Sequence, residues 1–450
     1  MKKLKNHKTT TKAAIFAGAA ALMALTPQIH AQTSVDNLLN KLEQKGILTP
    51  SEAKELKAEN ADDSAADFNQ ALNAKFPMPD WVTSYKLSGD FRGRFDDMNS
   101  DNPAIVDRIR LRYRLRVGLQ INMKDNFEVG FRLASGDGGN PLSNNQTLNG
   151  NASKKPLYVD AAYGKWTAIN DGTWMMAATI GKMNQPFDTS YMVFDPDYTP
   201  EGGALQMSYK FNDDQSLRFN TAALVLDELS GSSRDPFLYG GQITWDAKWT
   251  DHVGTSLGVA GYDIVNRANL STGYDSNEGN NTTGGAPTTK YNGTTFVDNY
   301  NPIVVDASAT YKMDSFPLYH GAFPVKVFGT YMVNPAATEN NQGASAGIAF
   351  GKSGKKGNWD ISYRYQWLEG DAWWDQIVDD DNAAAFPTSS TAAALRGGTN
   401  IKGHLVKLNY SILDSLTFTF TCYLNDLINN PVPASKTDAL HVMADLMWKF

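Results

Sequence analysis

Arginine occupies every second position in one short segment of the chain, and apolar residues fill the gaps. Residues 107–123 read DRIRLRYRLRVGLQINM, and the five arginines are Arg108, Arg110, Arg112, Arg114 and Arg116. Such a row can attract anions or pair with carboxylates. Because strand side chains alternate between two faces, the spacing predicts a strand whose arginines stand roughly 7 Å apart on one face. The segment is then either a surface strand of a soluble sheet or a strand whose arginines face a wet interior while its apolar side faces lipid.

No catalytic motif accompanies these arginines. The four histidines beyond the N-terminal region lie outside any recognisable nucleophile motif, and the sequence has no G-x-S-x-G. A single cysteine, Cys422, and the lack of a His/Asp cluster give no support to a metal site. We therefore expect no enzyme, no cofactor and no metal.

The N-terminus has the layout of a secretory signal peptide. Lysines precede the apolar run AAIFAGAAALMAL (13–25), and TPQIHA ends on Ala31, so residues 1–31 are predicted to be removed. Five of the 41 basic residues and none of the 48 acidic residues lie before Ala31, which leaves a net formal charge of −12 beyond it. That charge argues against nucleic acid as a partner.

The rest of the chain divides into a helical piece, a linker and a long β-rich region. Residues 32–57 are predicted to form a helical hairpin in the periplasm, which either docks or self-associates or is a loose appendage. Residues 58–80 are rich in Ala, Asp and Asn and are interpreted as a linker. From residue 81 to residue 450 the pattern alternates with period two, and no later segment resembles a spanning helix.

Sixteen alternating segments can be counted in residues 81–450, and short connections alternate with long ones. These segments are 83–96, 107–123, 126–134, 157–168, 173–183, 202–212, 215–227, 237–249, 252–264, 302–313, 323–333, 342–352, 357–369, 400–411, 414–425 and 438–450. Short turns on one side and long loops on the other are typical of a transmembrane antiparallel up-and-down β-barrel. The last segment ends on Phe450, as outer-membrane barrels do when they present their final strand to the assembly machinery.

These residues resemble a Gram-negative outer-membrane porin, more narrowly the putative porin family of 16-stranded barrels with an N-terminal helical hairpin. The segments that carry the resemblance are LLNKLEQKGILTPSEAKELK, KLSGDFRGRFD, RIRLRYRLRVGL, IGKMNQPF, FDPDYTPEGGALQ and the terminal MWKF. The resemblance implies a passive diffusion channel in the outer membrane, commonly a homotrimer, whose partners are lipid, small hydrophilic solutes and ions.

In such a barrel the arginine face would line the pore. The predicted basic wall comprises Lys86, Arg92, Arg94, Arg108, Arg110, Arg112, Arg114, Arg116 and Arg132. In the porins that this chain resembles, the loop after the fifth strand folds into the pore and narrows it, and here that connection, residues 183–203, carries Asp188, Asp195, Asp197 and Glu201. An acidic loop facing an arginine wall would set up a transverse field with a weak preference for anions. The alternative is that these carboxylates are ordinary loop charges in solvent.

Two other classes of protein stay open at this point. One is an outer-membrane barrel hydrolase, and the other is a soluble exported β-protein that binds carbohydrate. Heat-modifiable gel mobility separates a barrel from a soluble protein, and liposome swelling separates a pore from an enzyme.

Overall fold

The computed structural model describes residues 79–101, 106–137, 140–270, 291–292, 295–296, 298–382, 398–429 and 437–450. The predicted signal peptide (1–31), the helical hairpin (32–57) and all but the last two residues of the linker (58–80) lie outside the described residues. Those three assignments therefore stay predictions. The described strands all belong to one compact unit, Asp80–Phe450.

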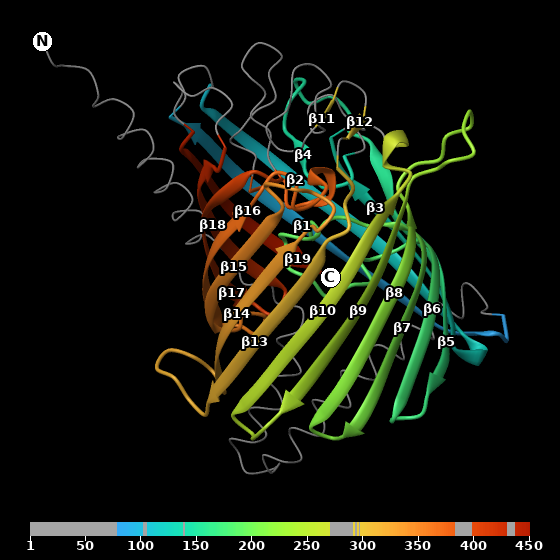
Figure 1. Cartoon of the computed structure of the whole chain (residues 1–450). Helices are drawn as coiled ribbons and strands as arrows, with labels where there is room; N and C mark the ends of the chain where they lie inside the picture. Colours follow the sequence, from blue (N-terminus) through green and yellow to red (C-terminus); the bar gives the residue numbers. More distant parts are fainter. Residues whose placement is uncertain are drawn as a thin grey trace, which may run out of the picture. The chain divides into compact units, whose positions relative to one another are not determined.

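Sixteen long antiparallel strands form a sheet that closes on itself (Figure 1). Closure is direct, because β1 pairs with β2 on one side and with β19 on the other. Each of the sixteen segments predicted from the alternation corresponds to one of these strands. The strands are β1 (Val82–Ser100), β2 (Arg108–Met123), β3 (Phe127–Ser135), β5 (Leu157–Asn170), β6 (Trp174–Lys182), β7 (Glu201–Asn212), β8 (Gln215–Val225), β9 (Phe237–Lys248), β10 (Val253–Val265), β13 (Ile303–Met313), β14 (Phe323–Val333), β15 (Gln342–Gly351), β16 (Trp359–Leu368), β17 (Ile401–Leu413), β18 (Leu416–Leu427) and β19 (Ala439–Lys449).

Shorter elements occupy the connections. The two-residue strand β4 (Gln146–Thr147) pairs with β2, and β11 (Tyr291–Asn292) pairs with β12 (Thr295–Phe296). The described residues also form three 3₁₀ turns: η1 (Lys124–Asn126), η2 (Arg267–Asn269) and η3 (Asp375–Ile377). The described ranges contain no α-helix, and no helix in them is long and apolar enough to cross a membrane.

The alternation places apolar side chains outside the barrel and the arginines inside it. On β2, Leu111 is 54 % exposed, whereas Arg114, three positions along on the opposite face, is 6 % exposed. The same apolar exterior continues around the ring, for example at Ile243, Val259 and Val327. An outward band of leucine, isoleucine, valine and aromatic residues is the surface that membrane barrels turn to lipid.

Short turns at one end of the barrel contrast with long loops at the other. Between β2 and β3, Asp125 and Asn126 have φ values of 59° and 61°, the left-handed pair that a tight type I′ hairpin requires. The long loops follow β3, β6, β10 and β16. Two of them carry most of the apolar packing inside the barrel: residues 183–200, here called the first interior loop, and the described residues 369–382 and 398–400, here called the second interior loop.

The chain end joins the closing seam. The amide of Gly89 on β1 donates to the carbonyl of Phe450 at 2.8 Å, and the amide of Phe450 donates to the carbonyl of Gly89 at 3.1 Å. A Cβ atom at Gly89 would lie 2.4 Å from both the Arg116 carbonyl oxygen and the Phe450 ring. Glycine at this position therefore lets the terminal aromatic ring lie against β1.

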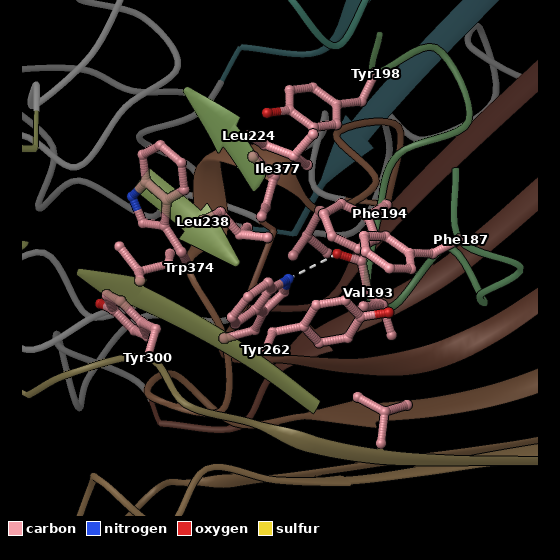
Figure 2. Close-up of a cluster of buried hydrophobic side chains, with 14 of the residues drawn as sticks. Phe187, Val193, Phe194, Tyr198, Leu224, Leu238, Tyr262, Tyr300, Trp374 and Ile377 are labelled. Atoms are coloured by element: carbon pink, nitrogen blue, oxygen red, sulfur yellow. Dashed lines mark hydrogen bonds between the residues drawn. The ribbon is translucent and has the colours of Figure 1, made fainter. Parts of the chain in front are cut away.

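The main apolar core lies inside the barrel, where the two interior loops pack on inward residues of the strands (Figure 2). Phe187 and Phe194 of the first interior loop stack at 6.1 Å, and both contact Tyr262 of β10 edge-on. Trp373 of the second interior loop packs against the same tyrosine. The strands contribute Leu224, Leu238, Ile264, Val304, Met332 and Leu368.

Candidate functional site

The arginines of β1 and β2 form one inward cluster because the register of the two strands pairs them. Arg92 lies opposite Arg114, and Arg94 lies opposite Arg112. Like charges directly across a strand pair destabilise it unless counter-charges are present. The cluster therefore depends on carboxylates brought from elsewhere in the fold.

Neighbouring positions on β1 and β19 supply most of those carboxylates. Arg94 makes a two-pronged contact with Asp445, with Nε and one terminal nitrogen at 2.8 and 3.0 Å from the two carboxylate oxygens. Arg110 reaches Asp96 at 2.7 Å. Asp90 accepts from Arg114 at 3.0 Å and from Arg116 at 2.7 Å. Such charge-assisted bonds are the strong ones, and they offset part of the positive charge of the cluster.

Two arginines of the cluster also face neutral oxygens from a segment that sequence reasoning did not place. Residues 140–147 turn into the barrel after β3. Arg92 donates to Oδ1 of Asn145 at 2.6 Å, and Arg112 donates to Oγ of Ser143 at 3.5 Å. The nearest carboxylates of Arg92 and Arg112 lie farther away, at 3.8 and 3.6 Å. These two guanidinium groups are consequently the least compensated of the cluster.

The remaining members of the predicted basic wall lie at its margins. Lys86 near the start of β1 and Arg108 at the start of β2 are exposed, and they lie toward opposite ends of this antiparallel pair. Arg132 on β3 contacts Asp160 of β5 and donates to Oδ1 of Asn184 at 3.0 Å. The central wall is therefore formed by Arg92, Arg94, Arg110, Arg112, Arg114 and Arg116.

The first interior loop crosses the lumen between two opposite parts of the barrel. At its start, the amide of Asp188 donates to Gln242 of β9 at 2.9 Å, and the Asp188 carboxylate lies 3.0 Å from Arg218 of β8. Near its end, Asp197 lies 3.0 Å from Arg114 of β2. One acidic loop thus contacts both the β8–β9 side and the arginine wall.

The four acidic residues predicted to lie in the connection 183–203 have different surroundings. Asp188 and Asp197 face arginines, as described above. Asp195 is buried, 3 % exposed, and faces the second interior loop. Glu201 is the first residue of β7, where its exposed carboxylate lies 3.1 Å from Lys182.

The second interior loop lies beside the first, and sequence reasoning did not assign it to the lumen. The indole Nε1 of Trp373 donates to the carbonyl of Val193 at 2.7 Å. The amide of Asp195 donates to the carbonyl of Ile377 at 2.8 Å. Asp381 lies 3.1 Å from Arg94. Both loops therefore bind the arginine wall, the first through Asp197 and the second through Asp381.

A signal for the second loop was present in the sequence. Residues 371–381 read DAWWDQIVDDD, which combines two tryptophans and five aspartates within a long connection. Adjacent tryptophans in a solvent-facing loop would expose a large apolar area, so this composition favours a buried loop.

His441 connects the wall to the same loop. Its Nε2 lies 2.7 Å from Oδ1 of Asp96, and its Nδ1 lies 2.8 Å from the carbonyl oxygen of Asp381. Both partners are acceptors, so both ring nitrogens must donate. This pattern fits a positively charged imidazolium between β1 and the second interior loop.

Like charges meet where the two interior loops touch. Carboxylate oxygens of Asp195, Asp379 and Asp380 lie within 4.8 Å of one another. Burial, together with Asp380 and Asp379, holds the pKa of Asp195 well above its ordinary value. Burial and Asp381 raise the pKa of Asp379 to about 6. The contact between the loops is therefore most stable with protons bound.

Comparison with known proteins gives a family and a fold. A family described as putative porin matches residues 98–321. No curated protein sequence matches the chain. Among solved structures, the high-pH structure of OprB from Pseudomonas putida aligns with a TM-score of 0.50 and 10% identity, covering 81% of this chain and 94% of that chain. A triple mutant of the Rhodopseudomonas blastica porin aligns with a TM-score of 0.42 and 9% identity, covering 82% and 100% respectively.

Proposed function

We propose, because this chain belongs to the putative porin family, that it is a passive diffusion channel for small hydrophilic solutes and ions in the outer membrane of a Gram-negative bacterium. The observation that carries the proposal is the distribution of side chains across a closed sixteen-stranded sheet. Apolar residues such as Leu111 lie outside, and charged residues such as Arg114 lie inside. A polar interior and an apolar exterior are the requirements of a water-filled pore in lipid.

The solute path is proposed to run along the arginine wall. The opposite part of the interior is filled by the apolar core and by the two interior loops. Asp197 of the first loop, which lies against Arg114 and Arg116, then borders the narrowest part of the proposed path. Rows of opposite charge across a pore orient dipolar solutes and screen ions by charge.

Selectivity among ions is proposed to be weakly in favour of anions. Each arginine of the central wall has a carboxylate within 4.0 Å, which lowers the field that a passing ion meets. Arg92 and Arg112, whose nearest carboxylates are the most distant, would contribute most of the remaining preference. Charges on the outer surface act little, because salt screens them within about 10 Å.

The wider biology of the chain is proposed on the same basis. Residues 1–31 would direct export, residues 32–57 would stay in the periplasm, and Phe450 would serve as the signal for the barrel assembly machinery. Association into a homotrimer is expected from the family. No cofactor is assigned to the site, and porins are typically non-enzymatic.

Neither earlier alternative is favoured by an observation in the structure. A soluble carbohydrate-binding protein would have to keep large apolar residues such as Ile180, 71 % exposed, in contact with water. A hydrolase would need a nucleophile and a base within hydrogen-bonding reach of each other. The contacts of the arginine wall are instead mostly arginine–carboxylate pairs.

Planar-bilayer conductance of the purified full chain in asymmetric salt tests the channel and its selectivity together. We expect discrete conductance steps and a small reversal potential of the sign given by anion flow. Liposome swelling with neutral sugars and amino acids tests passage of uncharged and dipolar solutes. A heat-denatured sample is the control, and the absence of both conductance and swelling in a heat-modifiable barrel would rule out a diffusion channel.

A further inference from the structure

The contact between the two interior loops joins acidic residues from segments far apart in the chain. We propose that this contact is a proton-dependent latch, which keeps the passage narrow while its carboxyl groups are protonated and releases the second interior loop when they ionise. The proposal rests on the channel function only for its effect on conductance. The latch itself concerns the association of the two loops and can be measured without any solute.

The arrangement of the three carboxyl groups carries the inference. Asp195 belongs to the first loop, and Asp379 and Asp380 belong to the second. Their oxygens lie within 4.8 Å of one another, and Asp195 and Asp379 are each 3 % exposed. Carboxylates this close and this poorly solvated cannot all be ionised without strong repulsion.

Asp195 also belongs to the structure of the contact. One of its oxygens accepts from the amide of Asp197 at 2.6 Å, and the other accepts from the amide of Asp380 at 3.4 Å. Its own amide donates to the carbonyl of Ile377 at 2.8 Å. A change in the charge of Asp195 therefore acts on the bonds that join the two loops.

Charged and titratable groups face this contact from several elements. Asp197 faces Asp195 from the first loop, and Asp381 faces Asp379 from the second. Arg364 of β16 lies 3.9 Å from Asp379 and 5.2 Å from the ring of Tyr191.

Further groups face the second interior loop from β18, β19 and β1, which follow β16 and β17 around the barrel. The hydroxyl of Tyr423 on β18 donates to Asp379 at 3.3 Å. Arg94 of β1 pairs with Asp381 at 3.1 Å, and His441 of β19 contacts the Asp381 carbonyl. Arg364 therefore acts on Asp379, and Arg112 acts on Asp380 and Asp381, whereas the charged groups nearest Asp195 are its acidic neighbours.

The direction of the pH effect follows from which state holds the protons more tightly. In the joined state the pKa of Asp379 is about 6 and that of Asp195 is well above its ordinary value of 3.8. Separation would return both groups to ordinary values. The joined state is thus fully favoured at low pH and loses stability as pH rises from about 4 through about 6 and beyond. A difference of roughly two units at one group corresponds to roughly 100-fold in the equilibrium between joined and released loops.

Single-channel conductance of the full chain between pH 5 and pH 9 tests the consequence. The wild type is expected to conduct more at high pH than at low pH. In Asp195→Asn and in Asp379→Asn the rise in conductance should occur at a higher pH, or the conductance should stay low over the whole range. The control is Asp251→Asn, which removes an exposed carboxylate in the short turn after β9 and should keep the wild-type transition. Heat-modifiable mobility verifies that each variant is folded.

Hydrogen–deuterium exchange of the detergent-solubilised barrel tests the latch itself. Protection is measured relative to the intrinsic exchange rate at each pH. In the wild type, peptides covering residues 190–197 and 373–381 should lose protection together as pH rises. In both Asn variants the same peptides should stay protected.

Unchanged protection of the wild type across the pH range would overturn the latch even if the protein conducts. A pH-independent wild-type conductance would also overturn it, as would protection that follows added calcium at constant pH. Absent conductance combined with a normal exchange transition would instead count against the channel function alone.

Discussion

The inner faces of β1, β2 and β19 carry guanidinium and carboxylate groups, whereas those of β8, β9, β10 and β13 carry apolar residues near the long loops. In the first region Arg94, Asp96 and Asp445 are buried in ion pairs. In the second region Leu224 and Leu238 are fully buried beneath the interior loops. Strand geometry is the same in both regions. The difference therefore comes from what covers each inner face.

The comparison shows how one barrel can hold both a polar wall and a packed core. Apolar side chains facing water inside a pore would each cost about 1.5–3 kcal/mol relative to burial. The interior loops remove that cost by covering them with Phe187, Phe194 and Trp373. The charged side stays free of the apolar core, and its Arg94 and Arg114 pair with Asp381 and Asp197 of the same loops.

The largest change should come from removing the centre of the packed region. Trp373→Ala deletes a fully buried side chain and its bond to Val193, so loop docking should lose about 3–5 kcal/mol. Conductance should rise several-fold while the barrel stays heat-modifiable. Trp174→Ala, which truncates a half-exposed tryptophan at the start of β6, is the matched control. An unchanged conductance in Trp373→Ala would mean that the loops do not limit flow.

A change of similar size, but in stability and selectivity, is expected in the charged region. Arg94→Met leaves Asp445 and Asp381 without their shared partner, which should cost about 3–5 kcal/mol. The thermal transition of the barrel should fall, and the reversal potential should move toward cations. The double variant Arg94→Met/Asp445→Met should be more stable than Arg94→Met alone, because it no longer buries the unpaired Asp445 carboxylate. Arg234→Met, at an exposed arginine of the β8–β9 loop, is the control.

The smallest change is expected where the first interior loop meets the wall. Arg114 and Arg116 are paired with both Asp90 and Asp197, and Asp197→Asn removes the second of these carboxylates. The free energy of loop docking should fall by about 1–3 kcal/mol. Freed guanidinium groups should raise the preference for anions, measured as the reversal potential in asymmetric salt. Asp251→Asn serves again as the charge-matched control. A shift toward cations in Asp197→Asn would contradict the placement of the wall along the path.

Much of the fold was determined by the sequence, because the period-two alternation is a local property. Side chains of a strand point to alternate faces, so the order of residues 107–117 was enough to place leucines on one face and arginines on the other. Short turns such as the one at Asp125 and Asn126 could be read for the same reason. The number of strands followed from this pattern, whereas the inward direction of the arginine row was inferred from the alternation of short and long connections and from the resemblance to porins.

The tertiary structure decided which loops enter the barrel and which charges meet. The bond between Trp373 and Val193 joins residues 180 positions apart, and the pair of Arg94 with Asp445 joins residues 351 apart. Period-two alternation carries no information about such distances, because it fixes only the face of each side chain. The second interior loop, the partners of the arginines and the acidic contact at Asp195 arise only when the closed sheet brings these segments into one interior.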